Sequence, residues 1–244
     1  AGPFFVKRVP ISGGAPVTIH EAMPGGNFPF GLTWPTMDTV VFANIEGIVR
    51  IPANGGAAEV LVPRGEDEHF DSPQILPGGE TVLFTRISGP PGNSGSSGTP
   101  PQVVVQSIGA DDRTVIWEGG SAARYLRTGH LVYAQGTALF AIPFDPAARA
   151  LRGGPVPMLD GLFRANNFLT DTANYAVSNT GTLVMIPGDP NAAGLPPWPT
   201  YDVSGRMTME LGDAVKARPI RNMPRLQFWE AFYGAQRKRS PLAA

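Results

Sequence analysis

The sequence predicts an all-β protein made of repeated units of four strands. Glycine (30) and proline (26) together supply 56 of the 244 residues, which favours turns and disfavours long helices. One strand pattern recurs after 42 residues, because Ile48 stands where Val6 stood (48 − 6 = 42). This spacing is close to the roughly 40 to 50 residues of one blade of a β-propeller, so the chain is predicted to be a β-propeller of four-stranded blades.

The first recurring element is a hairpin. Residues 6–14 and 48–56 each form a short alternating strand that ends in a glycine pair. Residues 16–19 and 59–62 supply the second strand, so each copy is predicted to fold as a hairpin. Further hairpins are predicted for 103–108 with 114–117, for 139–145 with 156–159, and within 200–206.

The second recurring element lies between the hairpins and consists of an entry residue, a tight polar turn and a run of strand formers. Its clearest copy is residues 73–84, and its relatives are 34–42, 125–133 and 177–185. The aromatic residues of these elements and of the third hairpin are predicted to form the core between blades. They are Trp34, Phe42, Phe84, Trp117 and Tyr133. Asp145, between Phe144 and Pro146, is expected to cap a turn.

Residues 73–84 and their copies resemble the P-x-h-S-P-D-G-x-x-h-h-F signature (h, apolar) of TolB-like, WD40-like (PD40) propeller repeats. Residues 129–133, 139–145, 154–157 and 177–184 resemble, more narrowly, the propeller that follows the membrane segment of bacterial receptor-type serine/threonine kinases. The sequence departs from the signature at Gly78, where aspartate is usual. The resemblance implies a ring of six blades and a periplasmic or extracellular location within a membrane-anchored protein.

The chain is expected to contain only part of that ring. Residues 1–226 are predicted to form about four to five blades, with residues 89–101 as a flexible low-complexity insertion. Residues 227–244, a basic and aromatic tail, abandon the repeat. We therefore expect a fragment with an open side, whose unpaired strand edges favour self-association.

Several kinds of chemistry have no support in the sequence. The chain has no cysteine and a formal charge of −1, which excludes thiolate sites and gives no electrostatic footprint for nucleic acid. No stretch is long and apolar enough to span a membrane. Phosphate loops, dinucleotide fingerprints, zinc helices, calcium loops and kinase motifs are also missing. No cofactor or metal is therefore predicted.

The best site candidate is the segment 66–71, in which carboxylates flank His69. Such a cluster can bind a metal or tune the imidazole, whereas the alternative interpretation is a solvated acidic loop. Loops 24–30, 66–71, 118–124 and 164–173 precede the innermost strands, so they are expected to meet at one mouth of the central channel. The predicted ligand-binding residues are Asn27, His69, Asp71, Arg124, Arg164, Asn166 and Asn167. His20 and His130 are expected to be exposed structural residues.

Two functions compete. The first is a noncatalytic module, not an enzyme, that binds a protein or small ligand at the channel mouth and serves as the sensory part of a larger bacterial protein. The alternative is a hydrolase (esterase or peptidase), or the propeller that gates one. A scaffold for envelope lipoproteins is a third interpretation, which the TolB-like resemblance implies.

Overall fold

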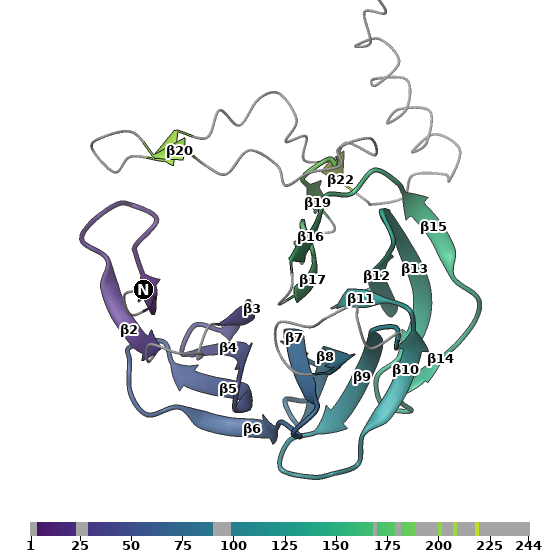
Figure 1. Ribbon diagram of the computed structural model, residues 1–244, viewed down its shortest axis with the longest axis horizontal. Coiled ribbons are helices and arrows are strands. Elements are labelled where there is room, and N and C mark those ends of the chain that lie inside the picture. The colour runs from purple at the N-terminus through teal and green to yellow at the C-terminus, as the bar shows by residue number, and fades with distance from the viewer. Residues whose placement is uncertain are drawn as a thin grey trace, which may run out of the picture.

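The computed structural model describes residues 4–22, 29–89, 99–167, 170–178, 182–188, 200–201, 207–208 and 218–219. All regular elements in this part of the chain are strands, and they form antiparallel sheets arranged as blades around an open arc (Figure 1). Within these ranges, no helix is long and apolar enough to cross a membrane. The protein is thus an all-β, incomplete β-propeller, as predicted.

Three consecutive sheets contain at least four strands each. Blade 1 has the order β3 (Phe30–Thr36), β4 (Thr39–Asn44), β5 (Gly47–Pro52) and β6 (Glu59–Pro63). Blade 2 has the order β7 (Glu68–Ile75), β8 (Thr81–Ser88), β9 (Gln102–Ser107) and β10 (Thr114–Glu118). Blade 3 contains β11 (Ser121–Leu126), β12 (His130–Gln135), β13 (Ala138–Asp145), β14 (Ala150–Leu151) and β15 (Val156–Leu159).

The remaining sheets are smaller. The N-terminal hairpin consists of β1 (Phe4–Arg8) and β2 (Val17–Ala22). At the other end of the arc, β18 (Tyr175–Val177), β19 (Thr182–Met185) and β22 (Arg218–Pro219) form a three-stranded sheet. Two further hairpins are β16 (Arg164–Asn167) with β17 (Thr170–Ala173), and β20 (Thr200–Tyr201) with β21 (Met207–Thr208). Among the described strands β1 pairs only with β2, which confirms the predicted open side.

The turns follow the sequence signals. In blade 1 the side chain of Asn44 accepts hydrogen bonds from the backbone N–H groups of Glu46 (2.8 Å) and Gly47 (3.2 Å), which closes the β4–β5 turn. The carboxylate of Asp145 accepts from the N–H groups of Ala147 and Ala148, both at 3.0 Å. This contact confirms the predicted role of Asp145 as a turn cap.

The core lies between neighbouring blades. Phe70 and Phe84 of blade 2 are fully buried, with ring centroids 4.7 Å apart, and they pack with apolar residues of blade 1. Phe42 and Tyr133 are buried as well, and Trp117 is half-buried against Tyr133. The prediction of core aromatics is therefore confirmed for Phe42, Phe84 and Tyr133, which are buried, and for Trp117, which is half-buried in the same core.

The prediction for Trp34 was wrong, because 48% of this side chain is exposed. Trp34 lies near the end of β3, on the side of blade 1 that faces the N-terminal hairpin. That hairpin supplies only two strands, which correspond to the outer strands of a blade, so the Trp34 end of the innermost strand β3 stays partly exposed. Counting the repeats predicts an incomplete ring, but the sequence of β3 itself does not show which of its side chains the incomplete blade leaves exposed.

The innermost strands of the three blades share a bulge. The register shifts between Phe30 and Leu32, between Asp71 and Gln74, and between Ser121 and Arg124. At each shift one residue adopts a left-handed backbone: Gly31 (φ 61°), Ser72 (φ 53°) and Ala122 (φ 52°). Such bulges bend a strand and re-aim its side chains, and here they do so beside the channel.

Candidate functional site

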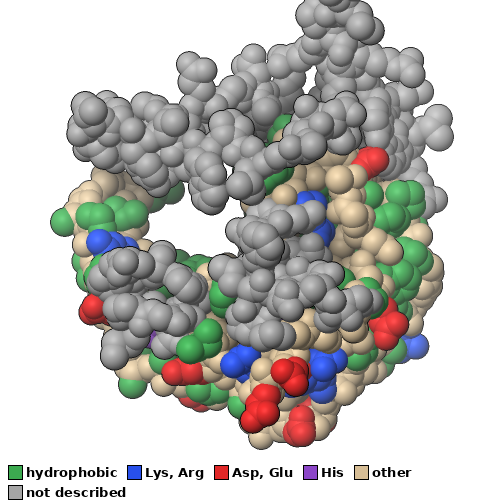
Figure 2. All heavy atoms as spheres, viewed as in Figure 1, with side chains coloured by type: hydrophobic (Ala, Val, Ile, Leu, Met, Phe, Trp, Pro, Cys, Tyr) green, Lys and Arg blue, Asp and Glu red, His purple; other side chains and the backbone are tan. Residues whose placement is uncertain are grey.

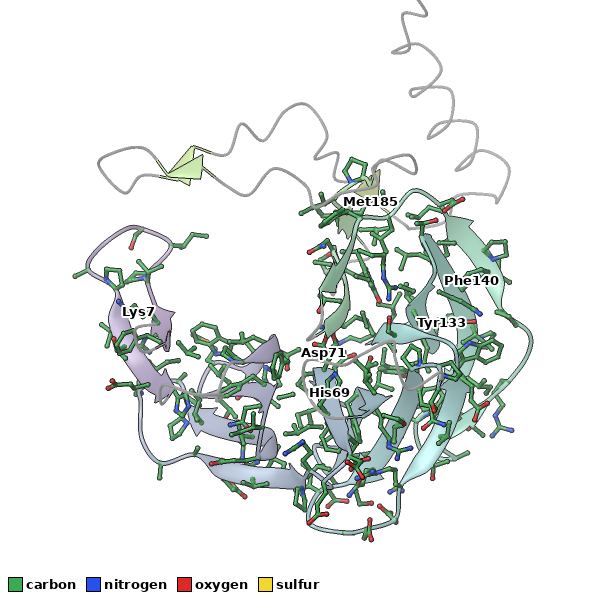
Figure 3. The ribbon with its side chains drawn as sticks, in the orientation of Figure 1. Lys7, His69, Asp71, Tyr133, Phe140 and Met185 are labelled. Atoms are coloured by element: carbon green, nitrogen blue, oxygen red, sulfur yellow. The ribbon has the colours of Figure 1, made fainter. Side chains whose placement is uncertain are left out.

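The channel site is built on the bulge of β7. Asp71 precedes the left-handed residue Ser72, and its carboxylate is 2% exposed. Its Oδ1 accepts a hydrogen bond from the Ser72 hydroxyl (3.2 Å), and its Oδ2 accepts one from the Thr172 hydroxyl (2.7 Å). Thr172 lies 101 residues further along the chain, on β17. The carboxylate therefore joins blade 2 to the neighbouring hairpin β16–β17, and Figure 3 shows Asp71 where β7 approaches that hairpin.

Gly31 explains how β3 approaches this carboxylate. A Cβ on Gly31 would lie 2.6 Å from the backbone N of Ser72 and 2.8 Å from Oδ1 of Asp71. Only glycine leaves room for this contact, and it also tolerates the left-handed backbone. The bulges of blades 1 and 2 thus stack directly on each other at the channel wall.

Two arginines approach the same wall from the other side. The guanidinium of Arg124, on β11, donates to the Ser72 carbonyl (2.7 Å) and to that of Ala123 (3.2 Å). Arg164, at the start of β16, donates to the Ser121 hydroxyl (2.7 Å). Both side chains are half-buried. The site therefore holds positive charge next to one buried carboxylate.

Tyr175 closes the site beneath the arginines. Its hydroxyl donates to the carbonyls of Ala122 (2.5 Å) and Val132 (3.0 Å). Burial raises the pKa of the Tyr175 hydroxyl, although Arg124 and Arg164 act in the opposite direction. The phenol is consequently neutral at physiological pH and holds β18 against the bulge of blade 3.

Some of the predicted site residues do meet. The structure brings Asp71, Arg124 and Arg164 to the channel wall. The backbone of Asn166 and Asn167 lies in β16, paired with Asp171 and Thr170, but their side chains lie outside the described part of the chain. Asn27 also lies outside it. The ligand-binding role of all these residues remains a prediction.

The segment 66–71 is not the exposed loop that we expected. β7 begins at Glu68, and both His69 (1% exposed) and Asp71 are buried. The His69 Nδ1 lies 3.4 Å from the Gly89 carbonyl, just after the end of β8. Among the described residues, no group of three or more histidine, aspartate or glutamate side chains could hold a metal ion.

Glu68 belongs to a separate ionic cluster. Its carboxylate accepts hydrogen bonds from Arg86, from Arg113 (2.9 and 2.8 Å) and from the backbone N–H of Gly65 (3.0 Å). The Arg113 guanidinium also lies over the ring of Phe70, 5.2 Å from its centroid. Burial raises the pKa of Glu68, but these hydrogen bonds outweigh it and lower the pKa overall. The charge of Glu68 thus serves packing within blade 2.

Sequence reasoning missed Ser72, Ser121, Thr172 and Tyr175. Ser72 and Ser121 flank the bulge of their strands, so aligning the innermost strands blade by blade could have found them. No local signal marks Thr172 or Tyr175. Their partners lie 43 to 101 residues away, and only the packing of successive blades brings them together.

The comparisons support the fold. No model of a known protein family matches the sequence, and no curated protein matches it. Among solved structures, the chain is similar to a calcium-binding protein, regucalcin, from Agrobacterium tumefaciens, with a TM-score of 0.52 and 10% identity over 83% of this chain and 65% of that one. An identity this low shows the β-propeller fold alone.

Two weaker similarities are to enzymes. An oligogalacturonate lyase in complex with manganese has a TM-score of 0.47 and 9% identity over 74% of this chain and 50% of that chain. The GH43 protein from Bacillus licheniformis has a TM-score of 0.43 and 12% identity over 67% and 37%. This chain spans less than two thirds of the length of all three structures.

These comparisons correct one prediction. The expectation of a noncatalytic module that is not an enzyme does not hold, because the β-propeller fold that the similarity shows does not exclude catalysis. That expectation follows from the resemblance to the propellers of receptor-type kinases and from the absence of familiar catalytic motifs. A propeller can assemble its site from single residues on separate blades, and such a site leaves no motif in the sequence.

Proposed function

We propose that this chain is a hydrolase that cleaves ester bonds at the channel mouth, with Thr172 as nucleophile and Asp71 as general base. The observation that carries the proposal is the 2.7 Å hydrogen bond from the Thr172 hydroxyl to the Asp71 carboxylate. A hydroxyl within this distance of a carboxylate meets the geometric requirement for an activated nucleophile.

The surroundings of the pair suit this chemistry. Asp71 is buried, so its carboxylate is poorly hydrated, and the Ser72 hydroxyl holds it in one orientation. Thr172 is half-buried and therefore keeps some contact with solvent. Arg124 reaches the carbonyl of Ser72, the residue next to Asp71. Its fixed positive charge can stabilise the negative charge that develops on an ester oxygen during attack.

The proposed reaction has two halves. Thr172 Oγ1 attacks the ester carbonyl carbon while its proton passes to Asp71, and the protonated Asp71 then gives that proton to the leaving alcohol. Water next attacks the acyl-threonine, with Asp71 again accepting and then returning the proton. Arg164 adds a second positive charge nearby, which favours an acyl group with an anionic substituent.

A substitution series tests this proposal. The purified chain is assayed with p-nitrophenyl esters of neutral and dicarboxylic acids and with peptide p-nitroanilides. Thr172→Val and Asp71→Asn should each lower the rate at least about a hundredfold, since each removes the general-base step. Thr137→Val is the matched control, because Thr137 forms the same contact with Asp160 (2.7 Å) at an exposed site outside the channel. Turnover that Thr172→Val leaves unchanged, or no turnover of any substrate, would overturn the proposal.

We also propose that the repeat is of the TolB type and that the protein acts in the periplasm or outside the cell, as part of a membrane-anchored protein. The support is the signature of residues 73–84, whose strand part coincides with β8. Fractionation of the native bacterium with an antibody against this chain tests the location. Recovery with cytosolic markers would contradict it.

A further inference from the structure

The N-terminal hairpin is a structural copy of the outer half of blade 1. β1 pairs with β2 at Val6↔His20 and Lys7↔Thr18, and β5 pairs with β6 at Ile48↔Val62 and Val49↔Val60. Each of these positions in β5 and β6 follows its counterpart in β1 and β2 by 42 residues. The register shift also recurs, between Val6 and Lys7 in β1 and between Ile48 and Val49 in β5.

The connecting turns agree too. Gly13 N–H donates to the Pro10 carbonyl and Gly55 N–H to the Pro52 carbonyl, both at 2.9 Å. The two glycines have φ angles of 90° and 87°. The hairpin is therefore not an irregular extension but the third and fourth strands of a blade.

The hairpin also occupies the place of a blade. Val6 and Ile19 are buried against blade 1, where they join Phe42 and Val49 in one apolar cluster. Their counterparts 42 residues later, Ile48 and Leu61, are buried against blade 2 in the same way. The Arg8 guanidinium adds a hydrogen bond to the Asn54 side chain of blade 1 (2.6 Å).

The first and second strands of this blade do not occur among the described residues. In blade 1 the channel side of β5 pairs with β4 along six residues, from Thr39↔Pro52 to Asn44↔Gly47. The corresponding side of β1 has no partner strand among the described residues. Next to it, residues 8–10 and 34–37 line an open groove of about 680 Å³.

The surface beside this edge is unusually apolar. Of eleven exposed large hydrophobic side chains among the described residues, seven fall within residues 5–37. Trp34 (48% exposed) and Met37 (88%) border the groove. In Figure 2 hydrophobic side chains gather on this hairpin, beside a patch of lysine and arginine. Exposed apolar side chains concentrated in one region favour an interaction site there.

We propose that the edge of β1 binds a β-hairpin of the same repeat type, whose second strand pairs antiparallel with β1 in the register of β4 with β5. The occupant is inferred from blade 1. There the hairpin β5–β6 has the same register, turn and neighbouring core as β1–β2, and its inner edge pairs with β4. In this register Val41 of the repeat would lie opposite Arg8, and Phe42 opposite Lys7. Backbone pairing would supply affinity, and the groove would take the apolar side chains.

A second copy of this chain fits the edge less well. In an antiparallel β1–β1 pair centred between Lys7 and Arg8, each of these cations would face a cation of the other copy. Like charges in opposed positions destabilise such pairing, and edge lysines are a common device against it. The occupant is therefore a strand of the β4 type rather than another β1.

Disulfide trapping tests the register, because the chain has no cysteine of its own. The probe is a synthetic peptide of residues 29–46, which covers β3 and β4. Arg8→Cys in the chain is combined with Val41→Cys in the peptide, and Lys7→Cys with Phe42→Cys. Neighbouring pairs alternate between wide and narrow spacing, so at least one matched combination can form the bond.

Two controls define the result. Combining Arg8→Cys with Phe42→Cys slips the register by one residue, and Glu59→Cys moves the cysteine to the exposed outer strand of blade 1. The best matched pair should give at least about tenfold more cross-link than either control, because a one-residue slip turns side chains to the other face. Equal yields would overturn the proposal. A homodimer of Lys7→Cys that excludes the peptide would also overturn it and assign the edge to a second copy.

Discussion

Glu68→Gln is the most informative test of what holds blade 2 together. The substitution keeps the shape of the side chain but removes its charge, and only 8% of the Glu68 side chain is exposed to solvent. Arg86 and Arg113 then lose their shared partner while staying partly exposed (31% and 22%). Hydrogen bonds to charged groups contribute about 1.5 to 3 kcal/mol each, and the two cations regain some hydration, so we expect a loss of roughly 2 to 4 kcal/mol.

The assay is urea unfolding at several pH values, with Glu59→Gln as the matched control. Glu59 forms the same kind of ion pair with Arg50, but both side chains are exposed (57% and 39%). We expect that control to cost at most about 1 kcal/mol. Equal losses for the two variants at pH 7 would refute the reasoning that burial makes the Glu68 cluster matter.

The pH dependence has a defined sign. The pKa of Glu68 is lower in the folded protein than its usual value of 4.5, so the unfolded chain binds more protons in the acid range. The stabilisation is therefore fully present above about pH 5 and is lost as the pH falls through the folded pKa. The difference between wild type and Glu68→Gln should shrink below pH 4. A difference that grows on acidification would contradict the assignment.

Two further predictions concern packing. Phe84→Ala should cost about 3 to 5 kcal/mol, because the ring is fully buried, whereas Trp34→Ala should cost only about 1 to 2 kcal/mol; similar losses in denaturant unfolding would show that Trp34 is covered. Gly31→Ala should cost about 1 to 3 kcal/mol more than Gly78→Ala, because both glycines have positive φ but only a Cβ at Gly31 would strike the backbone of Ser72. Equal unfolding midpoints would refute the close approach of blades 1 and 2.

The regular parts of the fold could be predicted because their signals are local. The runs of strand formers that close the second recurring element lie in strands β4, β8, β12 and β19, and the glycine-pair turns recur with the predicted spacing. Apolar alternation and turn residues act over fewer than ten positions, so the sequence carries them directly. The incomplete ring also followed from counting these units.

The start of β7 could not be predicted in this way. Glu68, His69 and Asp71 are polar, and a run with Phe70 as its only apolar residue is typical of a loop. The strand is stable because each polar group finds a distant partner. Glu68 reaches Arg113, 45 residues away, and Asp71 reaches Thr172, 101 residues away. Periodicity within a segment contains no information about such contacts.

The same contacts explain where the candidate site lies. Each innermost strand carries a left-handed bulge, and the bulges are joined in series: Gly31 packs on Ser72, and the Ser72 carbonyl accepts from Arg124. Tyr175 then reaches the carbonyl of Ala122. The bulges present backbone carbonyls to the polar side chains of the next blade. Asp71 therefore meets Thr172 at the channel wall because successive blades are held together there, and a change at Gly31 should disturb this contact even though Gly31 lies on another blade.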